Sequence, residues 1–455
     1  MKNAVYFPPL LWAFGLLLLF AAPIQADDSS DEPSEELFVT TGLPNYRIPA
    51  ITCTRKGTLV AVADYRYGGN DIGYGSVELR YRLSRDNGAT WGDIVEFTKG
   101  KYATSPKPKF DAAYGDPCIV ADRTSDSILI LSCSGNTGFP NGTREVHQGI
   151  ARFYSTDEGE SWSDPDYIQE PVYALFDKSS HGPVRSLFIG SGKIHQSRYV
   201  KVGKFYRLYC SIIVKDKSGV NCDYVIYSDD FGSTWKLLGD ADTPPIPSGD
   251  EPKAEELPDG SVICSSRVTG GRKYNIFTFS DVVAGEGSWG TCATSNASNN
   301  GVIAAGNSCN GEIMVVPAIR SVDGEKLYVA LQSVPFGYGK SNDGRDNVGI
   351  YYKELSNKSD FGTPADLARD WDGRHQATYL RSAYSTMCMQ ADGRVAFLYE
   401  ESTRNYDFSI IYKAYSLEDI TGGLYSLDAN PQRYAFISRY IDEEVSPFTM
   451  AMSAW

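Results

Sequence analysis

The chain has 455 residues, of which 42% are hydrophobic and 22% charged, and its formal net charge at pH 7 is −14. Such an acidic chain is a poor candidate for binding nucleic acid or an anionic membrane, because both need basic patches. Closed all-β folds often hold a chain of this length as a single domain.

The first 26 residues have the pattern of a secretory signal peptide. A cationic start at Lys2 precedes an apolar run over residues 10–23, and small residues up to Ala26 form a cleavage pattern. The run is shorter than a typical membrane span. We expect a secreted or periplasmic protein with no membrane span in the mature chain, in which residues 27–37 form an acidic lead-in. A retained anchor is the alternative.

Short runs rich in Val, Ile, Tyr and Phe dominate the rest of the chain, and clusters of Gly, Asp, Asn or Pro separate them. The clearest runs are residues 58–64, 77–83, 127–133, 205–214, 262–266, 326–332, 348–355 and 394–399. Regular short strands with turn residues between them predict an all-β sandwich, barrel or propeller.

A repeated turn motif favours the propeller. The pattern Ser-x-Asp-x-Gly-x-(Ser/Thr)-Trp occurs at residues 84–91, 155–162 and 228–235, with weaker echoes at 280–289 and 356–371. In such a turn Asp accepts backbone hydrogen bonds, Gly permits positive φ and Trp packs back onto the hairpin. Repeated units of this length indicate a propeller or a solenoid, with four strands in each blade. The motif resembles the Asp-box repeat, a hairpin clip that carries no catalysis.

Cysteine and histidine usage predicts no metal centre. The nine cysteines are an odd number, so at least one thiol is unpaired, and no CxxC or Cys/His metal spacing occurs. Most cysteines sit singly in apolar runs, where a small buried side chain is expected. The four histidines are too few and too scattered for a metal triad or a Ser-His-Asp relay. We therefore expect neither a metal nor another cofactor.

The segment Tyr46-Arg47-Ile48-Pro49 resembles the motif that carries the first substrate-binding arginine of the retaining exo-sialidase (neuraminidase) family. Further matches follow in the family's order over about residues 40–420. The resemblance implies a six-bladed β-propeller over residues 38–455 and a glycoside hydrolase. Its partners would be sialylated glycans of glycoproteins, glycolipids and oligosaccharides. We expect a monomer, and the segment after Gly423 lies beyond the resemblance.

Three arginines match the family's cage for the carboxylate of sialic acid: Arg47, Arg267 and Arg345. Planar guanidinium groups bind a carboxylate in a bidentate manner, which a lysine does not do. Asp346, beside Arg345, departs from the family pattern and would weaken the local positive field if its side chain points inward.

The resemblance assigns the nucleophile to Tyr384, in the segment Ser-Ala-Tyr-Ser. A neutral tyrosine avoids the repulsion that a carboxylate would meet next to the carboxylate of the sugar, and sialidases use one. A tyrosine with an ordinary pKa of about 10 is mostly protonated at neutral pH and needs a neighbouring base. Glu251 matches the family's base, and Glu255 in the same segment is the alternative.

The family's acid matches Asp71, in a Gly-rich loop that follows Arg66, an expected substrate contact. Asp71 would protonate the leaving oxygen and then deprotonate water; Asp64 is the alternative. Asp116, in Gly-Asp-Pro, matches a residue that binds a sugar hydroxyl. Glu400 matches the carboxylate that orients the first cage arginine.

Other functions fit parts of this pattern. A trans-sialidase or an intramolecular trans-sialidase would share the chemistry and differ only in what attacks the tyrosyl intermediate. A non-catalytic glycan-binding propeller would keep the arginines and lose the tyrosine, the glutamate or the aspartate. A propeller that serves only as a protein scaffold would lack the arginine cage.

Overall fold

The computed structural model describes residues 1, 35–304, 306, 309–339, 343–403 and 408–429. The predicted signal peptide after Met1 and the C-terminal residues beyond 429 lie outside the described residues. Within the described part of the chain, no helix is long and apolar enough to cross a membrane.

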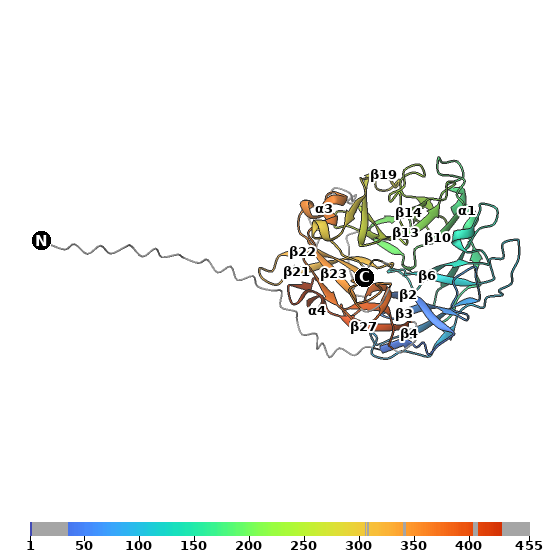
Figure 1. The fold of residues 1–455 in the computed structure, drawn as a ribbon, viewed down its shortest axis with the longest axis horizontal. Coiled ribbons are helices and arrows are strands. Elements are labelled where there is room, and N and C mark those ends of the chain that lie inside the picture. Colours follow the sequence, from blue (N-terminus) through green and yellow to red (C-terminus); the bar gives the residue numbers. More distant parts are fainter. Residues whose placement is uncertain (2–34, 305, 307–308, 340–342, 404–407, 430–455) are drawn as a thin grey trace. The chain divides into compact units, whose positions relative to one another are not determined.

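The unit that begins at Ser34 is a six-bladed β-propeller, as the sequence predicts. Six small sheets surround a central axis (Figure 1). The first contains β2 (Asn45–Cys53), β3 (Leu59–Arg66), β4 (Val77–Ser84) and β5 (Val95–Glu96). The second contains β6 (Tyr114–Ala121), β7 (Ile128–Ser134), β8 (Gly149–Ser155), β9 (Asp166–Tyr167) and β11 (Gly192–Lys193).

The third and fourth sheets follow in chain order. The third contains β10 (Ser186–Ile189), β12 (His195–Val202), β13 (Phe205–Lys215), β14 (Asn221–Ser228) and β15 (Lys236–Leu237). The fourth contains β16 (Lys253–Glu256), β17 (Val262–Val268), β18 (Gly271–Asp281), β19 (Glu286–Trp289) and β20 (Ala293–Ser295).

The last two sheets use strands from both ends of the unit. The fifth contains β21 (Ile313–Arg320), β22 (Lys326–Pro335), β23 (Val348–Leu355), β24 (Gly373–Gln376) and β28 (Tyr425–Leu427). The sixth contains β25 (Ser382–Met389), β26 (Val395–Glu401), β27 (Ser409–Tyr415) and β1 (Glu35–Phe38). Short helices connect the strands: α1 (Gln169–Ala174), α2 (Lys358–Phe361), α3 (Pro364–Ala368) and α4 (Leu417–Thr421), with η1 (Phe139–Asn141) and η2 (Ala297–Asn299).

Strand β1 closes the ring. It pairs antiparallel with β27, with Glu35 opposite Tyr412, so the N-terminal strand completes the last blade. Residues 35–37, expected in the acidic lead-in, instead belong to this strand. At the other end, β28 pairs with β21, with Leu427 opposite Ala318, which gives part of the segment after Gly423 a place in the fifth blade.

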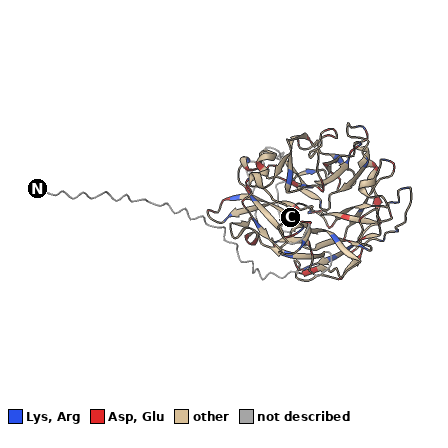
Figure 2. Cartoon of the chain, in the orientation of Figure 1, with Lys and Arg blue, Asp and Glu red and all other residues tan. Residues whose placement is uncertain are grey.

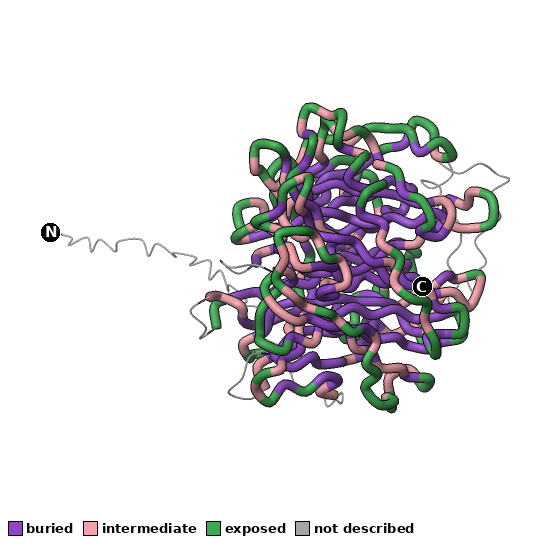
Figure 3. Tube along the Cα trace, turned by 90° about the vertical axis from the view of Figure 1, so that its right-hand side faces the viewer, coloured by how far each residue is buried: buried purple, intermediate pink, exposed green. Residues whose placement is uncertain are grey.

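The core lies between the faces of successive blades, where apolar side chains from neighbouring sheets pack together. Figure 3 shows the strands buried and the connecting loops exposed. Every residue of β7 is buried, for example. All nine cysteines are free thiols and only Cys292 is not fully buried, which confirms the expectation of small buried side chains.

The repeated motif forms the same turn in three blades. In the first, Ser84 Oγ donates to Asp86 Oδ1 at 2.8 Å, and Asp86 accepts the backbone N–H of Thr90 at 2.9 Å. Trp91 of this turn packs against Tyr412 of the sixth blade with ring centroids 5.2 Å apart. The repeat thus joins neighbouring blades, and none of its residues lines the cavity described next.

Candidate active site

One-residue bulges interrupt three strands, β2, β6 and β25, and the last two both pack against β2. The bulge in β2 lies between Arg47 and Ala50 and the one in β6 between Gly115 and Cys118. Ile48 has φ 53° and Asp116 has φ 50°. A proline follows each of these residues, which a bulge tolerates because its residues need not donate to the ladder. Bulges re-aim side chains and often lie beside active sites.

The structure brings the predicted catalytic and substrate-binding residues together around one cavity of about 480 Å³. They come from five of the six blades, and the third blade contributes Phe188, Lys215 and Asn221 to the remaining wall. The predicted residues that line the cavity are Arg47, Arg66, Asp71, Asp116, Glu251, Arg267, Arg345 and Tyr384.

Tyr384 and Glu251 are in direct contact. The phenol oxygen of Tyr384 donates to Glu251 Oε1 at 2.5 Å. Arg267 Nη1 lies 2.9 Å from Glu251 Oε2 and donates to the Tyr384 oxygen at 3.5 Å. Burial and the charge of Glu251 raise the pKa of Tyr384 well above its usual value, against the opposing effect of Arg267. The phenol is therefore protonated at neutral pH and has a base within hydrogen-bond distance.

Two further arginines flank the ring of Tyr384. The guanidinium carbon of Arg47 lies 5.5 Å from the ring centroid and that of Arg345 lies 5.6 Å from it. With Arg267 they place three cations around one phenol, although the chain as a whole is acidic. Figure 2 shows basic and acidic residues interspersed over the blades rather than gathered on opposite sides.

Glu400, in β26, supports the bulges in β2 and β25. Its Oε1 accepts hydrogen bonds from Arg47 Nε at 2.7 Å and from the backbone N–H of Ile48 at 2.8 Å. Its Oε2 accepts the backbone N–H of Tyr384 at 3.3 Å. The carboxylate is fully buried and does not line the cavity. It holds Arg47 and Tyr384 in place without lining the cavity itself.

Arg66 connects two acids. Its Nη2 lies 2.8 Å from Asp64 Oδ2 and 3.2 Å from Asp71 Oδ1. The side chain of Asp64 is fully buried, and its other oxygen accepts the backbone N–H of Asp116 at 2.9 Å. Asp64, the alternative acid, is therefore a support for Arg66 and for the β6 bulge and does not line the cavity. The side chain of Asp71 is 60% exposed and lines the cavity.

A tight turn carries Asp71. The backbone N–H of Tyr74 donates to the carbonyl oxygen of Asp71 at 3.1 Å. Gly73 has φ 88°, and a Cβ at this position would lie 2.1 Å from the backbone nitrogen of Gly138. Only glycine fits this combination of positive φ and close backbone approach. The Gly-rich sequence thus allows the loop to pack down beside the cavity.

Glu255, the alternative base, lies elsewhere. It is buried in contact with Lys193 at 2.6 Å and with Arg198, and it does not line the cavity. Although burial opposes its ionisation, the charges of Arg198, His195 and Lys193 hold the pKa of Glu255 well below its usual range. Such a carboxylate is a weak proton acceptor. Asp346, which would weaken the positive field, is buried and also does not line the cavity.

Sequence reasoning missed several cavity residues. Asp250 precedes Glu251, and burial together with the charge of Glu251 raises its pKa to about 6. Lys215 and Asn221 belong to the β13–β14 hairpin, and the ammonium of Lys215 lies 5.0 Å from the ring centroid of Phe139. The position of Asp250 next to Glu251, a predicted site residue, was a signal that could have identified it. The local sequence around Lys215 and Asn221 contains no such signal.

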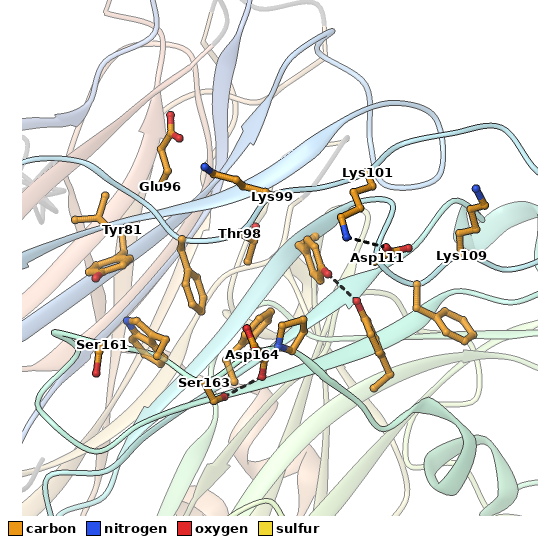
Figure 4. A pocket seen from close by; sticks show the side chains of 18 of the residues that line it. Tyr81, Glu96, Thr98, Lys99, Lys101, Lys109, Asp111, Ser161, Ser163 and Asp164 are labelled. Atoms are coloured by element: carbon orange, nitrogen blue, oxygen red, sulfur yellow. Dashed lines mark hydrogen bonds and ion pairs between the residues drawn. The ribbon is translucent and has the colours of Figure 1, made fainter.

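A second cavity, of about 860 Å³, lies between the outer strands of the first two blades (Figure 4). Its lining is aromatic and polar, with Lys101 3.8 Å from Asp111 and the hydroxyl groups of Tyr114 and Tyr167 2.7 Å apart. No arginine and no tyrosine–glutamate contact is found among its described lining residues. The smaller cavity, which the predicted residues line, is therefore the candidate active site.

Known proteins resemble the chain in sequence, although no protein-family model matches it. A sialidase of Micromonospora viridifaciens is 33% identical over 241 residues, which are 50% of this chain and 33% of that protein. A sialidase of Bacteroides fragilis is 23% identical over 394 residues, 82% of this chain and 62% of the relative. The chain thus spans less than two thirds of the length of both relatives. A sialidase of Paraclostridium sordellii is 24% identical over 362 residues, which are 78% of this chain and 81% of that protein.

Solved structures share the fold. The intramolecular trans-sialidase from Ruminococcus gnavus matches with a TM-score of 0.65 at 17% identity, covering 85% of this chain and 98% of that one. The leech intramolecular trans-sialidase matches with a TM-score of 0.65 at 18% identity, covering 84% and 69%. At such identities the structural likeness shows the propeller alone, and the relationship rests on the sequence matches. In sequence the chain is thus similar to sialidases of several bacteria.

Proposed function

We propose that the protein is an exo-α-sialidase that removes terminal sialic acid from sialylated glycans with retention of configuration, through a covalent intermediate on Tyr384. The observation that carries the proposal is the 2.5 Å contact between Tyr384 and Glu251 at the centre of three arginines. A phenol with a raised pKa is a poor nucleophile by itself. A carboxylate at hydrogen-bond distance removes that obstacle.

The arginines would bind the substrate carboxylate. Guanidinium forks suit this planar anion, and each charge-assisted contact contributes roughly 1.5–3 kcal/mol. Glu400 already holds Arg47 at 2.7 Å, so this arginine needs little reorganisation on binding. The carboxylate sits on the anomeric carbon of a sialoside. Binding it beside Tyr384 therefore also positions the reacting carbon.

In the first step the phenol oxygen attacks the anomeric carbon while Glu251 accepts its proton, and Asp71 donates a proton to the departing glycosidic oxygen. In the second step Asp71 takes a proton from water, the water oxygen attacks the same carbon, and Tyr384 leaves with the proton held by Glu251. Two inversions give net retention. The exposed position of Asp71, with a side chain 60% accessible, suits contact with the leaving group and with water.

Intramolecular transfer is a second candidate, because two of the solved structures that share the fold carry that name. It would use the same tyrosyl intermediate, which a hydroxyl of the bound sugar would attack in place of water. The test is incubation with a fluorogenic α-sialoside and identification of the released sugar by mass spectrometry. Free sialic acid supports the hydrolase, an anhydro sugar lighter by one water supports the intramolecular transfer, and no release contradicts both.

A further inference from the structure

A second group of chemically distinctive side chains lies in the third blade. His181, Asp216 and Cys222 each offer one donor atom, and these atoms all lie within 4.8 Å of one another. The three residues do not line the cavity described above. One imidazole nitrogen, one carboxylate oxygen and one thiol sulfur meet here, and the thiol also lies 3.4 Å from the carbonyl oxygen of Pro247.

Backbone hydrogen bonds bring the three donors together. Asp216 follows β13 and Cys222 lies in β14, and the turn between these strands is closed by Asp216 N–H donating to the Val220 carbonyl at 2.9 Å. His181 lies in the segment before β10, and its carbonyl accepts the N–H of Lys217 at 2.9 Å. The hairpin thus fixes two donors, and a backbone contact from the same hairpin fixes the third.

Further contacts orient the carboxylate. Asp216 Oδ1 accepts the backbone N–H groups of Ser218 at 2.8 Å and Val220 at 2.9 Å. Its other oxygen lies 3.3 Å from His181 Nδ1. Outer hydrogen bonds of this kind hold metal-binding carboxylates in place. Cys222 is 2% exposed, whereas the side chain of His181 is 27% exposed, so one side of the group is open to solvent.

We propose that His181, Asp216 and Cys222 bind a zinc ion. Nitrogen, oxygen and sulfur donors together suit Zn²⁺, while Ca²⁺ and Mg²⁺ take oxygen ligands. Zinc bonds of about 2.0–2.3 Å in a tetrahedron place the donors about 3.3–3.8 Å apart. The three atoms lie within 4.8 Å of one another, so side-chain movements of about 1 Å would bring them to that spacing. Water from the open side would complete the coordination.

The site would support one wall of the catalytic cavity. Lys215 and Asn221, the chain neighbours of Asp216 and Cys222, line that cavity. Zinc would fasten the hairpin that carries them to the segment of His181, without contact with the reacting atoms. The sequence gives no sign of this, because the donors come from segments 35 and 6 residues apart in no metal-binding spacing.

The test uses the full chain, stripped of metal with a chelator and titrated with ZnCl₂. We expect one equivalent of zinc to remain after gel filtration and the melting temperature to rise on zinc addition. Cys222→Ser and Asp216→Asn preserve size, and the amide oxygen introduced by Asp216→Asn would still accept the two backbone N–H groups. Each variant should bind zinc at least about tenfold more weakly.

Co²⁺ serves as a spectroscopic probe of thiolate ligation. We expect a sulfur-to-cobalt charge-transfer band in the wild type that is lost in Cys222→Ser and kept in Cys292→Ser, a matched change at a partly buried thiol. The proposal is overturned if the wild type retains no stoichiometric zinc, or if Cys222→Ser keeps both the wild-type affinity and the cobalt band.

Discussion

Glu400 and Arg47 form a partly buried ion pair in which Arg47 Nε lies 2.7 Å from Glu400 Oε1. The same carboxylate accepts the backbone N–H groups of Ile48 and Tyr384, so one side chain from β26 fixes two strands that carry site residues. The geometry of the arginine and of the tyrosine is thus set by a residue that does not line the cavity.

Replacing Glu400 should therefore damage catalysis from a distance. Glu400→Gln keeps the size of the side chain but removes the charge that holds Arg47. We expect kcat/KM on an aryl sialoside to fall by at least tenfold, with KM raised, because Arg47 is no longer held in position to bind the substrate carboxylate. Glu401→Gln is the matched control in the same strand. Similar losses in both variants would show that strand β26, and not the pairing with Arg47, is responsible.

Glu401 gives a separate prediction on stability. Burial raises the pKa of this carboxyl group above its usual value, against smaller opposing effects of Thr378 and Lys413. The folded state therefore holds a proton that the unfolded state has released between the unfolded pKa of 4.5 and the higher folded pKa. The contribution of Glu401 to the free energy of unfolding is therefore fully present below pH 4.5 and is lost as the pH rises through the folded pKa.

Glu401→Gln removes this dependence, since glutamine does not ionise. We expect the variant to melt higher than the wild type by about 1–3 °C at pH 8, with the difference shrinking at pH 4.5. Melting curves at both pH values measure this. A difference that grows towards acidic pH would contradict the assigned direction of the pKa shift.

Arg345 offers a test of the arginine cage at a residue that lies over the ring of Tyr384. Arg267 contacts Glu251 at 2.9 Å, so its loss would also disturb the base, whereas Arg345 lies over the ring of Tyr384. Arg345→Ala should lower kcat/KM by roughly 10–150-fold, the loss of about 1.5–3 kcal/mol. Arg345→Lys keeps the charge without the planar guanidinium group, so its kcat/KM should lie between those of the wild type and of Arg345→Ala. Near wild-type kcat/KM for the alanine variant would remove Arg345 from the substrate-binding residues.

Asp71 should show leaving-group dependence. Asp71→Ala removes the proton donor, which a natural glycan needs and an aryl sialoside with an acidic phenol scarcely needs. We expect a sharp fall in kcat/KM on sialyllactose and a much smaller one on the aryl substrate. Comparable losses on the two substrates would rule out the acid role for Asp71.

The sequence predicted the propeller because its signals are local. Each repeated turn is closed by contacts within a few residues, such as Asp86 with Thr90, and the apolar runs coincide with β3, β4, β7, β13, β17, β22, β23 and β26. Closure through β1 was not visible, because the pairing of Glu35 with Tyr412 spans nearly the whole chain. The sequence of a strand does not indicate which distant strand it pairs with.

The candidate site residues were predicted from a family resemblance and not from local sequence patterns. Residues such as Tyr384 and Glu251 were selected by resemblance to a family, and the fold places them in contact although 133 positions separate them. Chemistry alone left Glu255 and Asp64 open, and their buried ion pairs separate them from the cavity. The hairpin residue Lys215 reaches the cavity by the geometry of the blades, which local sequence does not encode.

The most direct test of the account is to trap the sugar on Tyr384. The substrate is a sialoside with fluorine beside the anomeric carbon and a good leaving group. The fluorine slows both steps, and the leaving group speeds up only the first, so the intermediate accumulates. Peptide mapping by mass spectrometry should then find the added sugar on Tyr384, and Tyr384→Phe, which removes one hydroxyl, should give a folded protein without the adduct. A sugar attached to another residue, or a first product of inverted configuration by NMR, would contradict the account.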